Sequence, residues 1–223
     1  MSWITESVSK AKKLKDHYRM HNIDIFIKDP LPKNVDVDYV LSFVSKRIPS
    51  FLMSNVDIIY IGYFDMFKEK QVNATYEDGA IYMTNEQSSN DDMIDDIIHE
   101  IAHSIEESHF ELLYGDHSVK EEFIGKRRRL FNLLDSYDYE PPKELFMDHH
   151  YNEELDMYLF KDIGYEILWN LIIGLFPSPY AATSLREYYA VGFEGYFMKS
   201  KKTIKEICPA LYSKLELLEY MEN

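Results

Sequence analysis

Apolar and polar residues alternate in two rhythms over the first part of the chain. Residues 7–21 have the spacing of an amphipathic helix, whereas Ile23–Ile27 has a period close to two, which predicts a short strand. Helical spacing returns over 37–48, and the stretch 56–63, rich in Ile and Tyr, predicts a buried strand. The amino-terminal part is therefore expected to combine strands and helices in a small mixed layer.

The clearest helix of the sequence follows a predicted hairpin. Strands at 72–76 and 80–84 flank Asp78-Gly79, a dipeptide typical of hairpin turns. Polar and acidic residues at 88–92 then form a helix-start signal. Beyond them an apolar stripe keeps helical spacing through Ile94, Ile97, Ile98, Ile101, Ala102 and Ile105. We expect a helix here with one buried face.

The second half of the sequence is predicted to be mostly helical. Helices are expected at 123–134 and 155–176, with an acidic, Tyr-rich surface loop at 135–154 between them. Within the first helix, Lys126-Arg127-Arg128-Arg129 is interpreted as a solvated helix face rather than a docking patch. A last predicted helix has a buried face formed by Leu185, Tyr188, Tyr189, Gly192, Phe193, Tyr196 and Phe197.

Composition and charge narrow the possible functions. The chain has 223 residues, 46% of them hydrophobic, which is enough for a sizeable core and excludes disorder as the overall state. Lys and Arg number 24 and Asp and Glu 39, so the net charge is −15, which argues against nucleic acid as a partner. Cys208 is the only cysteine, so a metal site would have to use His and carboxylate ligands.

The sequence also predicts where the protein is found. Its first residues lack the apolar run and cleavage site of a secretory signal, so we expect it in the cytoplasm of the producing cell, with delivery elsewhere by another component left open. The most apolar stretch, 163–176, is short and interrupted by Glu166 and Asn170, so no membrane segment is expected.

One short motif carries most of the candidate chemistry. His99 and His103 are four residues apart on the predicted helix, so both imidazoles lie on one face, close enough to bind one Zn²⁺ at about 2.0–2.1 Å. Glu100 lies beside that face, where it can take a proton from a water and return it to the leaving amine. Chance matches to His-Glu-x-x-His are expected about 0.02 times in this composition, so chance does not account for the motif.

A catalytic zinc site needs a third protein ligand, and two of the three candidates are histidines. His109 would give a metzincin-like pattern, but Glu106 replaces its turn glycine, so the helix is expected to continue and carry His109 about 15 Å from His99. His117, with His109-Phe110 before it, resembles the arrangement of SprT-like proteases, which usually act near DNA, and the acidic net charge argues against that. For both histidines we favour an ordinary polar surface position.

Glu187 is the strongest candidate for the third ligand. It lies on the predicted helix that starts at Thr183 or Ser184, on a face adjacent to the buried one, where it could project into a cleft. The alternative is a capping box, in which Ser184 caps the helix and the Glu187 carboxylate returns to the Ser184 amide. If Thr183 is the cap instead, Glu187 remains available for a metal.

The sequence around Glu187 resembles a known family. The stretch from Tyr180 to Glu187-Tyr-Tyr-Ala is similar to the third-ligand helix of the anthrax lethal factor family, which includes the clostridial Pro-Pro endopeptidases and consists of zinc peptidases of gluzincin type. The resemblance extends to the His-Glu-x-x-His helix and the hairpin before it. It implies a zincin-like fold, a zinc ion held by His99, His103 and Glu187, and Tyr180 as the residue that stabilises the oxyanion.

The chain departs from the family pattern at two points. Val191 stands where an acid often follows the glutamate ligand, so the partner of a zinc histidine must come from elsewhere, such as Glu194 or a backbone carbonyl. The gap between His103 and Glu187 is longer than in lethal factor and holds a predicted helical insertion. By analogy with the fold, the strand at 80–84 is expected at the sheet edge, where it could pair with an extended substrate.

The expected function is therefore that of a zinc-dependent endopeptidase acting on a peptide or protein. We predict one α+β, zincin-like catalytic domain over 1–223, in which 1–110 forms a small mixed twisted sheet with the active-site helix. Residues 111–223 form a mostly helical half that supplies the third ligand. An SprT-like protease that uses His117, and a non-catalytic binding or inhibitory module on a zincin scaffold, are the alternatives.

Overall fold

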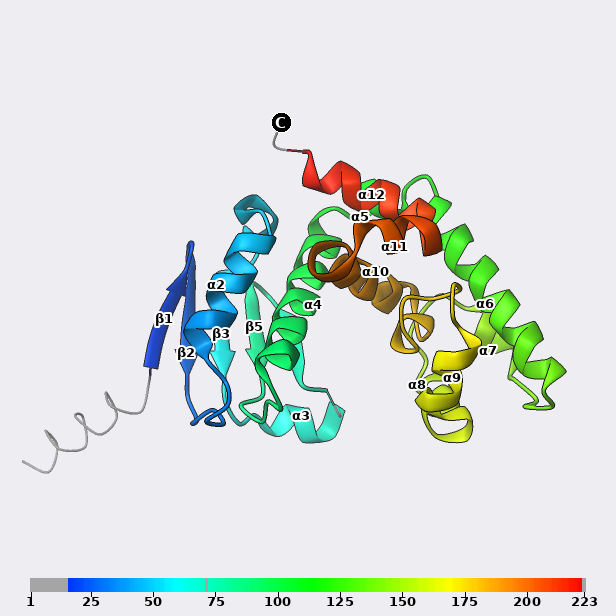
Figure 1. Ribbon diagram of the computed structural model, residues 1–223, viewed down its shortest axis with the longest axis horizontal. Helices are drawn as coiled ribbons and strands as arrows, with labels where there is room; N and C mark the ends of the chain where they lie inside the picture. Colours follow the sequence, from blue (N-terminus) through cyan, green and yellow to red (C-terminus); the bar gives the residue numbers. More distant parts are fainter. Residues whose placement is uncertain (1–15, 71, 222–223) are drawn as a thin grey trace, which may run out of the picture. The chain divides into compact units, whose positions relative to one another are not determined.

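A five-stranded mixed sheet is the framework of the first of two units into which the chain divides (Figure 1). The computed structural model describes residues 16–70 and 72–221, and the boundary between the units falls between Ser108 and His109. The predicted α+β class is confirmed, and the assignment of both units to one catalytic domain stays a prediction. The strands are β1 Asp16–Met20, β2 Ile23–Ile27, β3 Ile58–Ile61, β4 Ala74–Glu77 and β5 Ala80–Met83.

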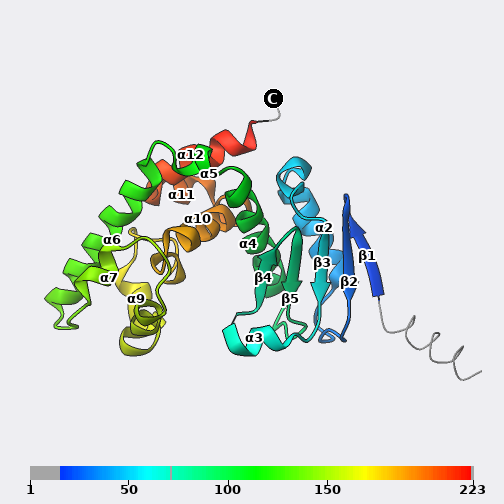
Figure 2. The same ribbon diagram turned by 180° about the vertical axis from the view of Figure 1, so that it is seen from behind.

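The order of the strands across the sheet is β1-β2-β3-β5-β4, as Figure 2 shows. β2, β3 and β5 are parallel to one another. The edge strand β1 is antiparallel to β2, and the edge strand β4 is antiparallel to β5. The prediction that the strand at 80–84 lies at the sheet edge is therefore wrong. Asp78 and Gly79, both at positive φ, form the tight turn that folds β4 back along β5 and makes β4 the edge.

β1 corrects a second prediction. The expected helix over 7–21 is wrong for Asp16–Met20, while residues 7–15 lie outside the described residues. His21, at φ 53, lies in the turn that reverses the chain, so that every residue of β1 pairs with β2. Pairing with a neighbouring strand therefore overrides the helical spacing of the apolar residues.

Two long helices pack against this sheet, and both were predicted from the sequence (Figure 1). They are α2 Val37–Arg47 and α4 Asn90–Ser108, which contact each other, and α4 also contacts β4 and β5. The Asp36 side chain caps α2 by accepting from the amide of Tyr39 at 3.0 Å. The apolar stripe of α4 is fully buried, as predicted. Shorter helices are η1 Ser50–Met53 and α3 Asp65–Lys70.

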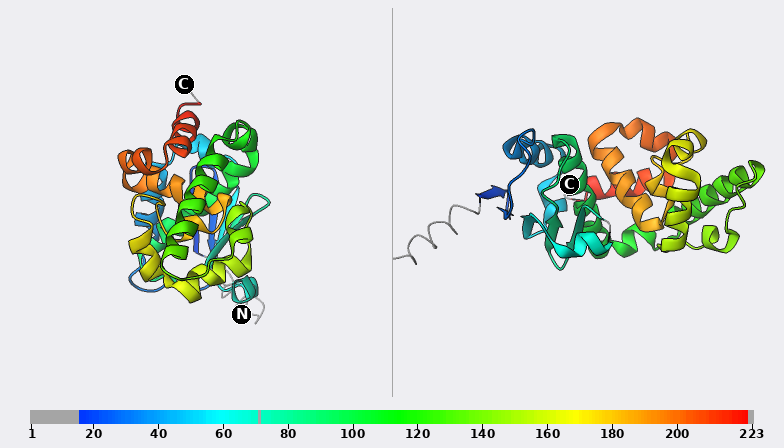
Figure 3. Two further views of the ribbon diagram at one scale, coloured as in Figure 1. Left: turned by 90° about the vertical axis from the view of Figure 1, so that its right-hand side faces the viewer. Right: turned by 90° about the horizontal axis from the view of Figure 1, so that it is seen from below.

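The second unit is helical (Figure 3). The α-helices in its described residues are α5 Phe110–Tyr114, α6 Ser118–Ser136, α7 Lys143–Met147, α8 Glu153–Met157, α9 Tyr165–Leu171, α10 Leu185–Glu194, α11 Lys201–Ile207 and α12 Pro209–Glu219. A 3₁₀ turn, η3, covers Tyr180–Ala182, and π-helical turns cover η2 Tyr158–Gly164 and η4 Gly195–Lys199. In the part of the chain that is described, no helix combines the length and the apolar character needed to cross a bilayer.

Two predictions for this unit are only partly right. The expected helix over 155–176 is interrupted, because Gly164 has φ 83 at the end of η2 and the chain leaves helical geometry after Leu171. The expected surface loop over 135–154 contains α7, whose Phe146 is fully buried and packs edge-on against Phe131 at 5.8 Å between ring centroids. An aromatic anchor in an otherwise polar stretch explains why α7 docks.

α6 and α10 form the core of the second unit. Tyr188 of α10 packs against Phe123 of α6, with ring centroids 5.5 Å apart, and against Phe176 at 5.9 Å. The predicted buried face is confirmed, although its last two residues, Tyr196 and Phe197, lie in η4. Gly192 is needed where α10 meets α12, because a Cβ there would overlap the side chain of Leu211.

Candidate metal centre

His99 and His103 form a pair on one face of α4, as their spacing predicts. Their ring centroids lie 4.7 Å apart and their planes are inclined by 82°. His103 is buried and His99 is partly exposed. Two imidazoles at this separation fit a zinc ion, because each offers one neutral nitrogen as a ligand.

Glu106 is the residue that sequence reasoning missed at this pair. Its Oε2 lies 3.5 Å from Nδ1 of His103, one helical turn away. A carboxylate at Nδ1 orients the ring and leaves Nε2 as the ligand atom. The partner expected from the sequence was Glu194 or a backbone carbonyl, and Glu106 was expected only as the residue that replaces a turn glycine. The i, i+3 spacing from His103 was the signal that could have identified it.

Glu100 is held by the edge strand of the sheet. The backbone N–H of Tyr76 in β4 donates to Oε2 of Glu100 at 2.6 Å. The amide of Thr84 donates to the carbonyl of Asn73 across the hairpin. Hydrogen-bonded and non-hydrogen-bonded pairs alternate along an antiparallel ladder, so the pair of Tyr76 and Ile81 is a non-hydrogen-bonded one. The N–H and C=O groups of Tyr76 therefore point away from β5. The carboxylate, 6% exposed, therefore takes an outward-facing donor of β4 and is fixed in orientation.

Asp96 lies one turn before His99 on α4. Burial raises the pKa of its carboxyl to about 6, and the hydrogen bond from Nε2 of Gln87, 3.0 Å long, opposes that rise. His99 also lowers the pKa of Asp96 while Glu100 raises it, so the three side chains share one electrostatic environment. Sequence reasoning did not single out Asp96.

Glu187 lies in the first turn of α10. Ser184 is the N-cap, and its Oγ accepts from the amide of Glu187 at 3.1 Å, which is one half of a capping box. The alternative in which Thr183 caps the helix is wrong, because the Thr183 hydroxyl donates to the carbonyl of Tyr180 at 2.8 Å. Ser184 is therefore the cap, as the capping-box alternative expected.

Tyr180 and Glu187 lie close together in the second unit and interact electrostatically. Burial raises the pKa of the Tyr180 hydroxyl, and the Glu187 carboxylate raises it further. Asp156, Tyr165 and Tyr151 belong to the same cluster, in which the Tyr151 hydroxyl donates to Asp156 at 3.0 Å. Tyr180 therefore stays protonated and keeps a proton to donate.

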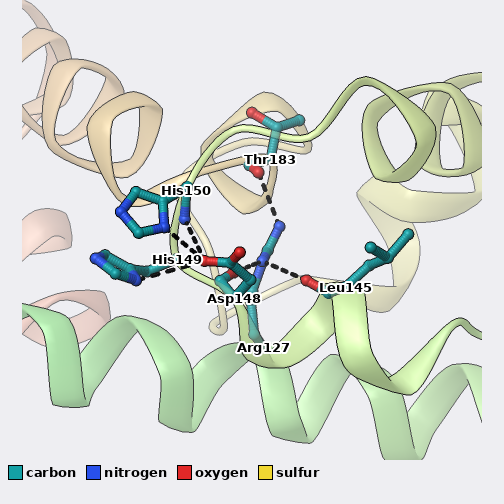
Figure 4. A network of polar contacts seen from close by, with 6 residues as sticks. All are labelled: Arg127, Leu145, Asp148, His149, His150 and Thr183. Atoms are coloured by element: carbon teal, nitrogen blue, oxygen red, sulfur yellow. Dashed lines mark hydrogen bonds and ion pairs between the residues drawn. The ribbon is translucent and has the colours of Figure 1, made fainter.

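A buried arginine holds the backbone that leads into α10. Arg127 has no exposed surface, and its guanidinium donates to the carbonyl of Ala182 at 2.8 Å. It also donates to the carbonyl of Thr183 at 2.8 Å (Figure 4). It also donates to Leu145 at 3.1 Å and to the carbonyl of Asp148. Burial lowers the pKa of Arg127 to about 10, so the guanidinium remains charged at neutral pH.

The solvated face predicted for the basic run is therefore wrong at two of its four residues. Lys126 is also buried, and its Nζ donates to the carbonyls of Leu175 at 2.8 Å and Ile207 at 2.5 Å. Only Arg128 and Arg129 are exposed. Lys126 and Arg127 donate hydrogen bonds to backbone carbonyls at helix ends and in loops that have no partner within their own element. These acceptors lie far along the chain, so the local pattern of charges does not predict that the two side chains are buried.

Comparison with known proteins does not assign this chain to a family. No family model, no curated protein and no solved structure matches it. The resemblance to the lethal factor family thus remains an expectation based on the residues of the motif. The chemistry of the side chains described above is the basis for assigning a function.

The other two candidate ligands occupy distinct positions in the second unit. His117 is exposed, has φ 62 and precedes α6 without capping it through its side chain. His109, partly exposed, precedes α5, and α4 ends at Ser108, so the expected continuation of α4 through His109 is wrong. Nδ2 of Asn55 donates to the carbonyl of Ser104 at 3.0 Å, which satisfies a carbonyl in the last turn of α4 and favours its end there.

Proposed function

We propose that the protein is a zinc-dependent endopeptidase with a zincin-like fold of gluzincin type. The observation that carries this proposal is the His99 and His103 pair on a helix packed against a mixed sheet, with Glu100 held beside it. We assign Glu187 as the third ligand, as the resemblance of its sequence to the third-ligand helix of the lethal factor family implies. Two imidazoles and one carboxylate form a ligand set typical of catalytic zinc.

Each residue of the proposed site has a separate task. Zinc bound there would lower the pKa of a water molecule and polarise the scissile carbonyl. Glu100 would accept a proton from the attacking water through Oε1, because Tyr76 already binds Oε2, and would then pass it to the leaving amine. Tyr180 would donate its hydroxyl hydrogen bond to the oxyanion, a role supported by the raised pKa that keeps the hydroxyl protonated.

An extended peptide is the substrate that suits the edge of the sheet. β4 pairs with β5 on one side, and Ala74 directs its backbone groups to the other side, where the carbonyl of Tyr76 also points while its N–H is bonded to Glu100. We infer that a substrate strand lies along this side, close to Glu100, in the manner of an added β-strand. The acidic net charge of −15 favours substrates that are neutral or basic.

The test combines metal content with cleavage of a peptide library. The full chain, purified without chelator, should contain about one zinc per chain at its primary site and should cleave extended peptides, and the E100Q variant should keep the zinc without cleaving. Absence of bound metal would refute the proposal. Zinc without turnover in the wild type would instead indicate a non-catalytic module on the same scaffold.

A further inference from the structure

A second cluster of side chains that could hold a metal ion lies in the loop between α7 and α8 (Figure 4). Asp148, His149 and His150 are consecutive, and each offers one ligand atom within 4.8 Å of the other two. Oδ1 of Asp148 lies 2.8 Å from Nδ1 of His150 and 3.6 Å from Nδ1 of His149. The two imidazole ring centroids are 3.9 Å apart.

These distances suit a tetrahedral metal ion. With metal–ligand bonds of about 2.0–2.1 Å, tetrahedral ligand atoms lie about 3.4 Å from each other. The two distances from Asp148 lie on either side of that value, so small side-chain rotations would bring these ligand atoms to the spacing that an ion requires. We propose that Asp148, His149 and His150 bind a divalent transition metal, such as Zn²⁺, at a site separate from the His99 and His103 pair.

The backbone of this loop is held in place from both sides. Arg127 donates to the carbonyls of Leu145 and Asp148, and the carbonyl of His149 accepts from the amide of Leu185 at 2.8 Å. The amide of His150 donates to Oδ1 of Asp148 at 3.0 Å. A loop that is already ordered loses little conformational freedom when an ion binds, which favours binding.

The site is open to solvent. The side chains of Asp148, His149 and His150 are 53%, 25% and 73% exposed, so an ion can enter and keep a water as its fourth ligand. Because the His149 carbonyl is bonded to Leu185, an ion here would also strengthen the attachment of this loop to the start of α10. The second unit should therefore become more resistant to unfolding when the ion binds.

Zinc titration of the full chain against a chromogenic chelator tests this site. In the H99A/H103A background, which removes the primary pair, one equivalent of Zn²⁺ should still bind, and adding H149A/H150A should abolish that binding. Adding H109A/H117A to the H99A/H103A background instead should leave one equivalent of Zn²⁺ bound. D148N keeps the carbonyl that Arg127 contacts and should weaken binding about tenfold or more.

A second measurement keeps the test independent of chelator competition. Zn²⁺ should raise the midpoint of thermal unfolding of the H99A/H103A protein and leave that of the H99A/H103A/H149A/H150A protein unchanged. The inference is overturned if H99A/H103A binds no Zn²⁺, or if binding survives H149A/H150A. Neither result bears on the proposed peptidase site, whose ligands are different residues.

Discussion

The N–H of Tyr76 donates to the carboxylate of Glu100 across 2.6 Å, which joins the edge strand of the sheet to the helix that carries the two histidines. A charge-assisted hydrogen bond to a backbone amide is short and strongly oriented. It fixes the Oε2 end of the carboxylate in the residue that directly follows His99 on α4. The predicted general base is thus oriented by the backbone of β4.

Replacing Glu100 by Gln should abolish most peptide cleavage while zinc stays bound. The amide oxygen of Gln can still accept from Tyr76, so the helix and the sheet keep their contact, but the side chain can no longer take a proton. We expect kcat to fall by about 10²- to 10⁴-fold. Turnover and zinc content of the same preparations provide the measurement, and full turnover in the variant would exclude Glu100 as the base.

Replacing Glu187 by Gln or Ala should remove stoichiometric zinc from the primary site. The carboxylate is the proposed third ligand, and two imidazoles alone hold zinc more weakly. The same change to Ala at His109 or His117 should leave that zinc in place. Metal analysis of all four proteins in the H149A/H150A background distinguishes the primary site, and retention of zinc by both Glu187 variants would contradict the assignment.

Replacing Tyr180 by Phe should lower kcat with little change in zinc content. Loss of one hydrogen-bond donor to an oxyanion typically costs a factor of about 10² to 10³ in kcat. Tyr165, whose pKa is also raised by burial in the same cluster, offers a matched control, because Y165F removes a hydroxyl to which we assign no catalytic role. Equal losses from the two variants would show that the cluster is structural.

Replacing Arg127 by Met should strongly destabilise the second unit. The guanidinium serves four backbone carbonyls from a fully buried position, so its removal leaves acceptors without donors at a cost of about 3–5 kcal/mol in the free energy of unfolding. The stability of R127K should lie between that of the wild type and that of R127M, because an ammonium group can donate to some of these carbonyls but lacks the planar fork of a guanidinium. Urea unfolding provides the measurement, and R128A, at an exposed neighbour, should change stability by less than about 0.5 kcal/mol.

Replacing Asp96 by Asn should stabilise the metal-free protein at neutral pH. Burial raises the pKa of Asp96 from 3.8 to about 6, so between these values the folded state holds a proton that the unfolded state has lost. The free energy of unfolding therefore falls as pH rises through that range, by up to about 3 kcal/mol, and Asn avoids the loss. Unfolding measured at pH 7 should favour D96N, and the advantage should vanish below pH 4. A pH-independent difference would rule out this cause.

Local spacing alone predicted the elements closest to the candidate chemistry. The acidic first turn and the apolar stripe of α4 predict the helix that places His99 and His103 on one face, and Asp78-Gly79 predicts the hairpin before it. Both depend on interactions between residues a few positions apart, which the order of residue types is enough to specify. The buried face of α10 was predictable for the same reason.

Tertiary structure alone decided which strands pair and which charges are buried. β1 is a strand because β2 lies beside it, and β4 rather than β5 is the edge because β5 also pairs with β3. Arg127 is buried because carbonyls from two distant loops need a donor, although its sequence neighbours indicate a solvated face. In each case the stabilising partner is far along the chain, so no local pattern contains it.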